Sequence, residues 1–426
     1  MPHLQTGFHP KLFTAWREGY GAQSFRADVI AALTVAIVAL PLSMAIAIGS
    51  HVSPERGLYT AIIGGFLISA LGGSRYQIGG PAGAFIVLIA SIVDTKGLDG
   101  LLLATLMAGV ILFAVGISGL GRFIRYVPHA VTIGFTAGIA VIIFASQIKD
   151  LFGLILSAEP SALVPKLGAL WGVSGTLHPF ALLISAASIA LIQGLRMWRP
   201  QWPSLLIAVV LASMAALLMP GAVETIATRF HSIPSALPMP HIPDTSMSRI
   251  VELLPSALSL ALLGGIESLL SAIVADSMSG RFHRSNTELM AQGLANVAAA
   301  LFGGIVATGT IARTATNIRA GAKSPVAGML HAVFLLLFML VAAPLLGYIP
   351  LAALAGILAT VCWNMADKAQ FWSLLKAPKA ETLVMLATFL LTIFVDLTSG
   401  ILAGVILAFI LGPREFLRAP KYHHQP

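Results

Sequence analysis

Charged residues are scarce in this sequence: Asp, Glu, Lys and Arg make up only 10% of its 426 residues. Soluble domains carry about 25% charged residues, so water is not the solvent for most of this surface. Apolar runs of roughly 18 to 22 residues recur along nearly the whole chain, which is the length that crosses the hydrocarbon core of a bilayer. The sequence therefore predicts an all-α polytopic protein embedded in the lipid bilayer, and it excludes a soluble protein with a large core.

Cysteine and the common enzyme motifs are also missing. The single cysteine, Cys362, excludes an internal disulfide and any cysteine-based metal site. The 11 histidines show no HxxxH or HExxH spacing, and the chain has neither a Walker-type phosphate loop nor a G-x-S-x-G elbow. We therefore expect no enzyme activity, no catalytic residues, no cofactor and no metal site.

The basic residues indicate a topology. The net charge of +8 would suggest nucleic acid as the partner of a soluble protein, but here the basic residues lie in short loops, where they set orientation. With about fourteen apolar segments and the N-terminus inside, 18 of the 25 Lys and Arg residues fall on the inner side and six outside. We expect a multi-pass protein of the cell (inner) membrane with both termini in the cytoplasm and no nucleic-acid partner.

A proline-containing, weakly apolar stretch divides the chain into two halves of seven segments each. An odd number of segments per half places the second half upside down, so a structural repeat must be an inverted one. The boundaries that we expect are a cytoplasmic N-terminal segment at 1–27, a first repeat at 28–220, an external connector at 221–249, a second repeat at 250–414 and a cytoplasmic tail at 415–426.

The third segment of each half is short and is opened by Gly or Pro, near residues 80–92 and 309–320. Such segments can simply allow close helix packing. Interrupted helices at matching positions of two inverted halves, however, indicate a binding site at the middle of the membrane. The first N–H groups of a helix are unpaired and lie at its positive dipole end, so two facing helix starts form a pocket suited to an anion.

Two charged residues lie deep in apolar segments. Arg313 is near the start of the second broken helix, where it would add positive charge to an anion site; the alternative is a structural arginine that pairs or reaches an interface. Glu267 lies in the middle of the eighth segment, with Ser271 four residues on. It could carry a coupling proton, ligate Na⁺ together with Ser271, or neutralise Arg313.

Several stretches together resemble the sulfate permease (SulP) family of anion transporters, over about residues 28 to 415. They are DVIAALTVAIVALPLSMA from Asp28, GLYTA from Gly57, GPAGA from Gly80, GFTAGIA from Gly134, NTELMAQGLAN from Asn286 and GTIART from Gly309. The resemblance implies seven-plus-seven inverted repeats like those of the uracil permeases, split into a core and a gate domain.

The same resemblance implies where the substrate lies, between the third and tenth helices and beside the first. The implied substrate-binding residues are Leu42, Ser43, Ile46, Ala82, Gly83, Ala84, Phe85, Ile311, Ala312, Arg313 and Thr314. It also implies a coupling-ion site at Glu267 and Ser271, where bicarbonate carriers of the family look to have a sodium-binding aspartate; glutamate here favours a proton over Na⁺. Leu42 replaces a Gln that is common in the family, so one polar substrate contact is missing.

Family members usually carry a cytoplasmic STAS domain after the last helix, and we expect none in this chain, which ends at Pro426. They also form dimers, so we expect a homodimer. The function predicted is proton-coupled symport of a small anion by alternating access, with a dicarboxylate such as fumarate ahead of sulfate and bicarbonate. The alternatives are a nucleobase permease on the same fold, an anion channel, and a voltage-sensitive structural protein.

Overall fold

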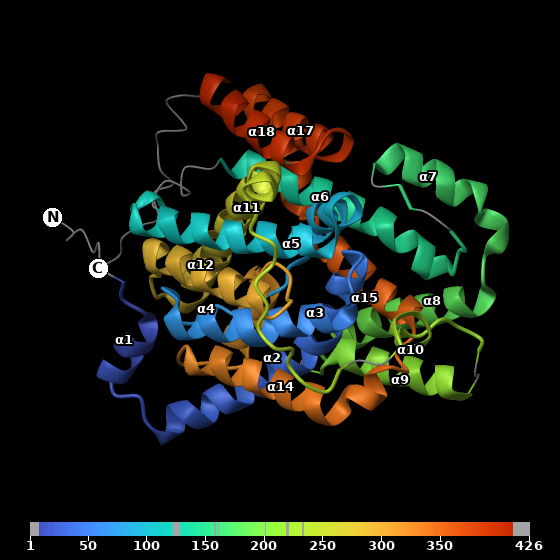
Figure 1. Cartoon of the computed structure of the whole chain (residues 1–426), viewed down its shortest axis with the longest axis horizontal. Coiled ribbons are helices and arrows are strands. Elements are labelled where there is room, and N and C mark those ends of the chain that lie inside the picture. Colours follow the sequence, from blue (N-terminus) through green and yellow to red (C-terminus); the bar gives the residue numbers. More distant parts are fainter. Residues whose placement is uncertain are drawn as a thin grey trace.

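The computed structural model describes residues 8–121, 128–156, 159–160, 162–200, 202–218, 221–231 and 234–411. The predicted tail at 415–426 and the first seven residues of the predicted N-terminal segment lie outside this range. Helices joined by turns and loops make up the described chain (Figure 1), together with one pair of two-residue strands.

The described residues of the first half form ten α-helices. They are α1 (Lys11–Arg17), α2 (Ala22–Gly49), α3 (Pro54–Tyr59), α4 (Gly65–Leu71), α5 (Ile86–Ile117), α6 (His129–Phe152), α7 (Leu163–Gly172), α8 (Pro179–Trp198), α9 (Ser204–Leu218) and α10 (Ile226–Phe230). The π-helical turn η1 (Thr60–Gly64) joins α3 to α4, the strand β1 (Gly79–Gly80) and the 3₁₀ turn η2 (Gly83–Phe85) precede α5, and the 3₁₀ turn η4 (Ser174–Thr176) follows α7.

In the second half, the part of the chain that the structure describes forms eight α-helices and the second strand. They are α11 (Met247–Ser279), α12 (Ser285–Leu301), the strand β2 (Thr308–Gly309), α13 (Ile311–Arg319), α14 (Val326–Leu346), α15 (Leu351–Met365), α16 (Lys368–Leu375), α17 (Lys379–Phe394) and α18 (Leu397–Leu411).

Each of the fourteen predicted membrane segments corresponds to a helix or half-helix. Six described helices, namely α2, α5 with its leading turn, α6, α8, α11 and α14, are long and apolar enough to cross a membrane alone. Among them α5 breaks at Gly97 (φ 71°, ψ −178°), so it supplies both the third and the fourth segment. The other seven fall on α3–η1–α4, α9, α12, α13, α15, α17 and α18. The prediction of a polytopic membrane protein with fourteen segments is therefore confirmed.

The membrane helices pack into two groups. A core group contains α2 to α5 and α11 to α14, which pack mainly on one another. A gate group contains α6, α8, α9, α15, α17 and α18, and Figure 1 shows α6, α17 and α18 along one side of the molecule. Each group takes its members from matching positions of the two halves, namely segments one to four and five to seven. This is the arrangement that an inverted repeat produces.

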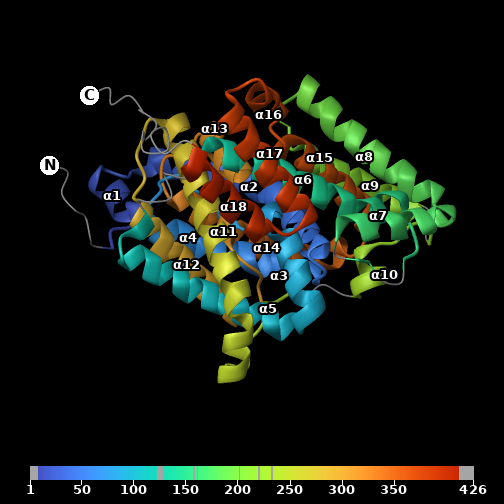
Figure 2. The ribbon, with the colours of Figure 1, turned by 90° about the horizontal axis from the view of Figure 1, so that it is seen from above.

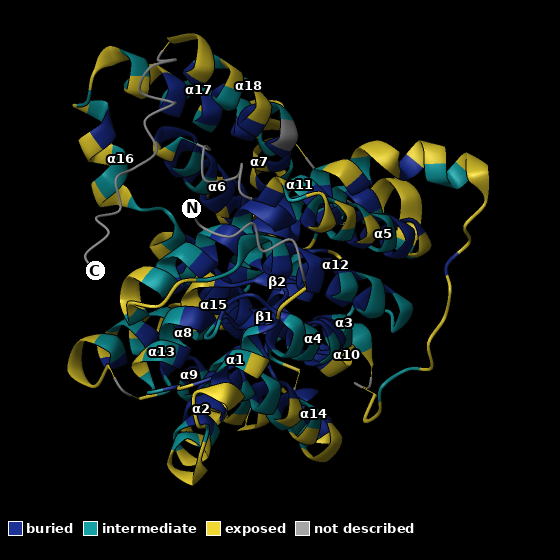
Figure 3. Cartoon of the chain, turned by 90° about the vertical axis from the view of Figure 1, so that its left-hand side faces the viewer, coloured by how far each residue is buried: buried dark blue, intermediate teal, exposed yellow. Residues whose placement is uncertain are grey.

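The two halves meet at the strands. Gly79 pairs with Gly309 and Gly80 with Thr308 in an antiparallel ladder. Figure 3 shows both strands at the buried centre of the molecule, surrounded by helices. Each strand is followed at once by a helix start, η2 and α5 on one side and α13 on the other. The two interrupted segments that the sequence places at matching positions thus lie side by side.

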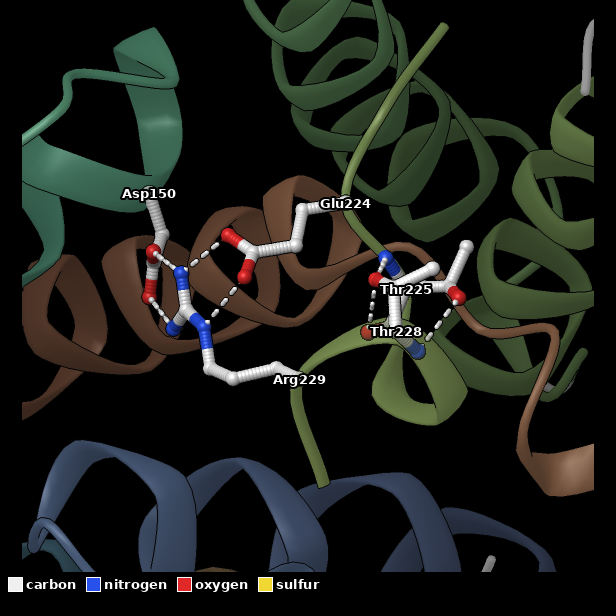
Figure 4. A network of polar contacts seen from close by, with 5 residues as sticks. All are labelled: Asp150, Glu224, Thr225, Thr228 and Arg229. Atoms are coloured by element: carbon white, nitrogen blue, oxygen red, sulfur yellow. Dashed lines mark hydrogen bonds and ion pairs between the residues drawn. The ribbon is translucent and has the colours of Figure 1, made fainter. Parts of the chain in front are cut away.

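The chain between the two halves contains the short helix α10 within the predicted connector at 221–249. The N–H groups of Ile226 and Ala227 donate to the carbonyls of Ile349 and Gly347, in the turn between α14 and α15. Arg229 donates to the carboxylates of Asp150, at the end of α6, and of Glu224 (Figure 4). Because α14 belongs to the core group while α6 and α15 belong to the gate group, the connector is attached to both.

The helices α1 and α10 lie at opposite ends of the molecule in both Figure 1 and Figure 2. Seven membrane segments separate them in the chain. An odd number of crossings moves the chain from one side of the membrane to the other, so this placement agrees with the predicted topology.

Candidate functional site

The strand crossing requires glycine at two positions. Gly80 has a left-handed φ of 154°, and a Cβ there would lie 2.3 Å from Nη1 of Arg313. At Gly309 a Cβ would lie 1.6 Å from Nε2 of Gln77. Only a residue without a side chain allows these backbones and side chains to approach so closely. The Gly-Gly-Pro and Thr-Gly-Thr motifs of the sequence therefore have a direct structural reason.

The two helix starts lie next to this crossing. Ala82 is extended (φ −119°, ψ 144°) and the helical turn begins at Gly83; Thr310 is extended (φ −112°, ψ 120°) and α13 begins at Ile311. Neither start carries a side-chain cap. The first N–H groups of each helix therefore lack an intrahelical partner and expose the positive end of the dipole. These starts fall within the ranges that the sequence predicts, 80–92 and 309–320.

Arg313 joins three elements at this point. Its Nη2 donates to Oγ of Ser43 on α2 (3.2 Å) and to the carbonyl of Pro81 (3.3 Å), while its Nη1 lies against Gly80. The side chain is 2% exposed, and its Nε and Nη1 have no hydrogen-bond partner within the described chain. The predicted alternative in which Arg313 reaches an interface is therefore wrong, because the guanidinium lies inside the core group.

The other predicted substrate-binding residues are mostly buried. Leu42, Ser43 and Ile46 of α2 are buried, as are Ala82, Ala84, Phe85 and Thr314, while Gly83 is partly buried. Ile311 and Ala312, the first two residues of α13, are exposed. The start of α13 is thus accessible although the guanidinium behind it is not.

Glu267 and Ser271 have different surroundings in spite of their spacing on α11. Ser271 shares a hydrogen bond with the hydroxyl of Thr314 (3.2 Å), and Ser268 of the same helix accepts one from Gln77 (2.8 Å). Glu267 instead lines a small pocket between the core and gate groups. The residues of this pocket are Val131, Thr132, Phe135, Thr136, Ile266, Glu267, Leu270 and Ile401.

No ion pair joins Glu267 to Arg313 within the described chain, and Glu267 makes no hydrogen bond there. Of the three roles left open by the sequence, neutralisation of Arg313 is therefore wrong. The carboxylate faces the boundary across which the two helix groups contact each other.

Three polar side chains hold the broken segments in place. The side-chain amide of Asn296 donates to the carbonyl of Ala307 (2.8 Å) and accepts a hydrogen bond from the N–H of Ala307 (2.9 Å). It thus satisfies both backbone groups of Ala307, as a neighbouring strand would. Oγ1 of Thr60 accepts from the N–H of Ile305 (2.7 Å). The carboxylate of Glu288, on α12 of the second half, accepts hydrogen bonds from the N–H groups of Gly73 and Ser74 in the first half. Buried backbone groups outside a helix need such partners in a membrane.

Sequence reasoning missed part of this framework. It took Glu267 as the only deep carboxylate, whereas Glu288 and Asp28 are fully buried as well. Asp28 accepts hydrogen bonds from Tyr20, Lys323 and Ser324, so it ties α2 to the turn after α13. His331 is fully buried on α14, with neither ring nitrogen bonded within the described chain. All three lie near the ends of apolar segments, where sequence alone does not separate loop from buried helix end.

Comparison with known proteins decides the family. The profile of the sulfate permease family matches residues 25–388. YvdB of Bacillus subtilis, whose name assigns it to sulfate transport, is 43% identical over 414 residues, which cover 97% of this chain and 78% of that protein. The chain belongs to the sulfate permease family. It is therefore a multi-pass membrane transporter of anions and not an enzyme.

A further relative and two solved structures support the fold. The bicarbonate transporter BicA of Synechocystis is 32% identical over 402 residues, 91% of this chain and 70% of that protein. The transmembrane domain of a cyanobacterial BicA superposes with a TM-score of 0.80 at 31% identity, covering 91% of this chain and 98% of that one. The murine Solute Carrier 26 family member A9 gives a TM-score of 0.85 at 19% identity over 94% of this chain and 70% of that one, which supports the fold alone.

Proposed function

We propose that this chain is a proton-coupled symporter of a small anion, with a dicarboxylate such as fumarate as the substrate ahead of sulfate and bicarbonate. The substrate binds at the strand crossing, between the starts of η2 and α13 and beside α2. Movement of the core group against the gate group exposes that position to one side of the membrane at a time.

The guanidinium of Arg313 carries this proposal. It is buried, it has two N–H-bearing nitrogens without a protein partner, and no carboxylate pairs with it in the described chain. An uncompensated buried charge costs several kcal/mol. A bound anion removes that cost by supplying both the opposite charge and the missing acceptors, and the two helix starts add further positive potential.

The surroundings of the crossing favour an anion with a carbon skeleton. Leu42, Ile46 and Phe85 are buried apolar residues, and the resemblance to the family implies that Leu42 stands where its members often carry Gln. Apolar walls with a few placed polar groups are typical of sites for organic ligands. The names of the relatives point to sulfate and bicarbonate for those proteins, so both anions belong in the test.

The position of Glu267 supports a proton as the coupling ion. The Na⁺ site predicted from the sequence needs Glu267 and Ser271 together, but the Ser271 hydroxyl is engaged with Thr314. Glu267 is left facing Thr132 and Thr136 of the gate group. A carboxyl group at this boundary can take up a proton in one position of the core group and release it in the other.

Orientation and assembly complete the proposal. We assign α1 and α16 to the cytoplasm and α10 to the outside of the cell membrane because most basic residues then lie inside. We also propose a homodimer, on the resemblance to the family.

The test is an uptake panel in proteoliposomes. Purified protein is assayed with radiolabelled fumarate, succinate, oxalate, sulfate, bicarbonate and uracil, with and without an inward pH gradient. We expect saturable uptake of at least one dicarboxylate, stimulated by the gradient, and none of uracil. In Glu267→Gln the stimulation is lost, because the amide carries no proton.

Four results would contradict parts of this proposal. Uptake of sulfate or bicarbonate without any dicarboxylate would overturn the substrate class. Accumulation driven by a sodium gradient at fixed pH would overturn proton coupling. Large non-saturating currents would indicate a channel, and saturable uracil uptake would indicate the nucleobase permease.

A further inference from the structure

The short helix α1 carries aromatic side chains on its outer surface. Phe13 and Trp16 are 56% and 60% exposed, and their rings meet edge to face with centroids 6.5 Å apart. Phe8, just before the helix, is exposed as well. Aromatic side chains of this kind are enriched at the boundary between lipid and water. Since α1 directly precedes the first membrane helix, its outer surface lies at that boundary.

The helix α1 is held against the core group by specific bonds. The N–H of Lys11 donates to the carbonyl of Gly72, at the end of α4 (2.9 Å). Arg284, just before α12, donates to the carbonyl of His9 (2.8 Å) and to the hydroxyl of Thr14 (3.2 Å). The position of α1 is therefore fixed relative to the ends of α4 and α12.

Positive charge accumulates beneath this helix. The ammonium of Lys11 is partly buried and makes no hydrogen bond or ion pair within the described chain. Burial, followed by the charges of Arg284 and Arg75, lowers the pKa of Lys11, so the arginines lie close to it. The carboxylate of Glu18 is already shared by Arg75 and Arg281. Four cations thus lie near two carboxylates there: Glu18, which is shared by two arginines, and Asp276, which is bonded to His283. Neither carboxylate forms an ion pair with Lys11 in the described chain.

We propose that this junction binds the phosphate head group of an anionic phospholipid. The junction consists of Lys11, Arg75, Arg281 and Arg284, with Phe13 and Trp16 at its outer edge. The cations accept the phosphate, while the two aromatic rings contact the glycerol and the first acyl carbons. A lipid fits better than a free phosphate because a lipid can use both the cations beneath α1 and the exposed rings on its outer surface at the boundary of the membrane, whereas a free ion would use only the cations.

The experiment measures lipid binding to the purified full chain in an uncharged detergent. Phosphatidylglycerol, phosphatidylcholine and soluble glycerol phosphate are titrated separately, and binding is followed by native mass spectrometry and by the rise in melting temperature. Each basic residue near an anionic head group contributes about 1 kcal/mol, or roughly a five-fold change in affinity. We expect phosphatidylglycerol to bind at least that much more tightly than the other two.

Two variants and a matched control locate the binding. Lys11→Gln and Arg281→Gln should each weaken phosphatidylglycerol binding about five-fold. Arg281 is 54% exposed at its side chain, so its replacement leaves the fold intact even if Lys11→Gln does not fold. Lys379→Gln is the control, because Lys379 is an exposed lysine on the same predicted side, at the start of α17, and should leave binding unchanged.

Three outcomes would overturn the proposal. Equal binding of phosphatidylcholine would remove the role of charge. Equal protection by glycerol phosphate would indicate a free-anion site in place of a lipid site. An unchanged affinity in both Lys11→Gln and Arg281→Gln, or an equal loss in Lys379→Gln, would place the lipid elsewhere on the protein.

Discussion

At the scale of single residues, the site depends on a glycine as much as on an arginine. Gly80 allows the guanidinium of Arg313 to lie against the backbone, at a φ that other residues rarely adopt. The guanidinium in turn links Pro81 with Ser43 of α2. One position without a side chain therefore lets three elements converge on the centre of the membrane.

This leads to a prediction for Gly80→Ala. The added methyl group would meet Nη1 of Arg313 at 2.3 Å and would strain the backbone, so the guanidinium must shift. We expect a loss of about 1 to 3 kcal/mol in stability, seen as a lower melting temperature, and at least a ten-fold loss of anion uptake. The control is Gly172→Ala at the end of α7, where nothing lies within 4 Å of the new carbon. Equal behaviour of the two variants would contradict the close packing described here.

The sequence predicted some of these residues and not others, for a physical reason. Arg313 and Glu267 stand out because charge in the middle of an apolar segment is costly. Asp28 and Glu288 do not stand out, because the sequence around them contains other polar residues. Their burial comes from tertiary packing, in which a helix end of one half covers a loop of the other, and a single sequence does not contain that information.

At the scale of elements, the connector helix α10 is attached to both helix groups. The backbone of α10 donates hydrogen bonds to the α14–α15 turn. Arg229 of α10 also contacts Asp150 and Glu224 (Figure 4). These contacts join the connector to both helix groups at the end of the molecule opposite α1. The two ion pairs raise the pKa of Arg229 although its burial acts in the other direction. The guanidinium is therefore charged at every pH that the protein tolerates, and it holds α10 against α6.

Replacing this arginine should weaken the attachment of the connector. In Arg229→Gln, Asp150 loses its charged partner while staying mostly buried, at 16% side-chain exposure. Hydrogen bonds to charged groups contribute about 1.5 to 3 kcal/mol, so we expect a clear drop in melting temperature. Asp150→Asn in the same background should add little. Arg249→Gln, which removes a 3.8 Å surface contact with Asp244 of the same connector, is the control and should change stability by less than about 1 kcal/mol.

The broken segments show which elements the sequence pattern predicts and which it does not. The sequence located both interruptions within a few residues, since Gly and Pro mark them directly. It did not predict that the two short strands pair, nor the short helices α7, α10 and α16. Those helices lie outside the apolar segments, where hydrophobic periodicity gives no signal.

At the scale of the whole molecule, the inverted repeat determines the topology. Seven segments per half place α10 and α1 on opposite sides, and the orientation that we propose puts α1 inside because most basic residues then lie there. The class, the number of segments and the family were all predictable, because hydropathy and charge are properties of the whole chain. The packing of the core group against the gate group was not, since lipid-facing and protein-facing apolar residues look alike in a sequence.

The topology can be tested with single cysteines. The native cysteine, Cys362, is buried and can be replaced by Ala to give a cysteine-free background. Thr245→Cys before α11 and Ser373→Cys on α16 then each offer one exposed thiol, separated by five membrane segments. We expect a membrane-impermeant maleimide to label Thr245→Cys in intact cells and Ser373→Cys only after permeabilisation. The reverse pattern would invert the topology, and labelling of both in intact cells would contradict the number of segments.

The central claim is that an anion binds where the two broken helices begin, opposite the guanidinium of Arg313. The most direct test compares Arg313→Gln with Arg319→Gln. Arg319 is an exposed arginine two turns later on the same helix. The measurement is concentration-dependent uptake, in proteoliposomes, of the anion that the panel selects. We predict that Arg313→Gln abolishes saturable uptake, at least a hundred-fold or about 3 kcal/mol, in protein that still elutes as folded, while Arg319→Gln transports like the unaltered chain. Saturable uptake of equal affinity and rate in both variants would contradict the account.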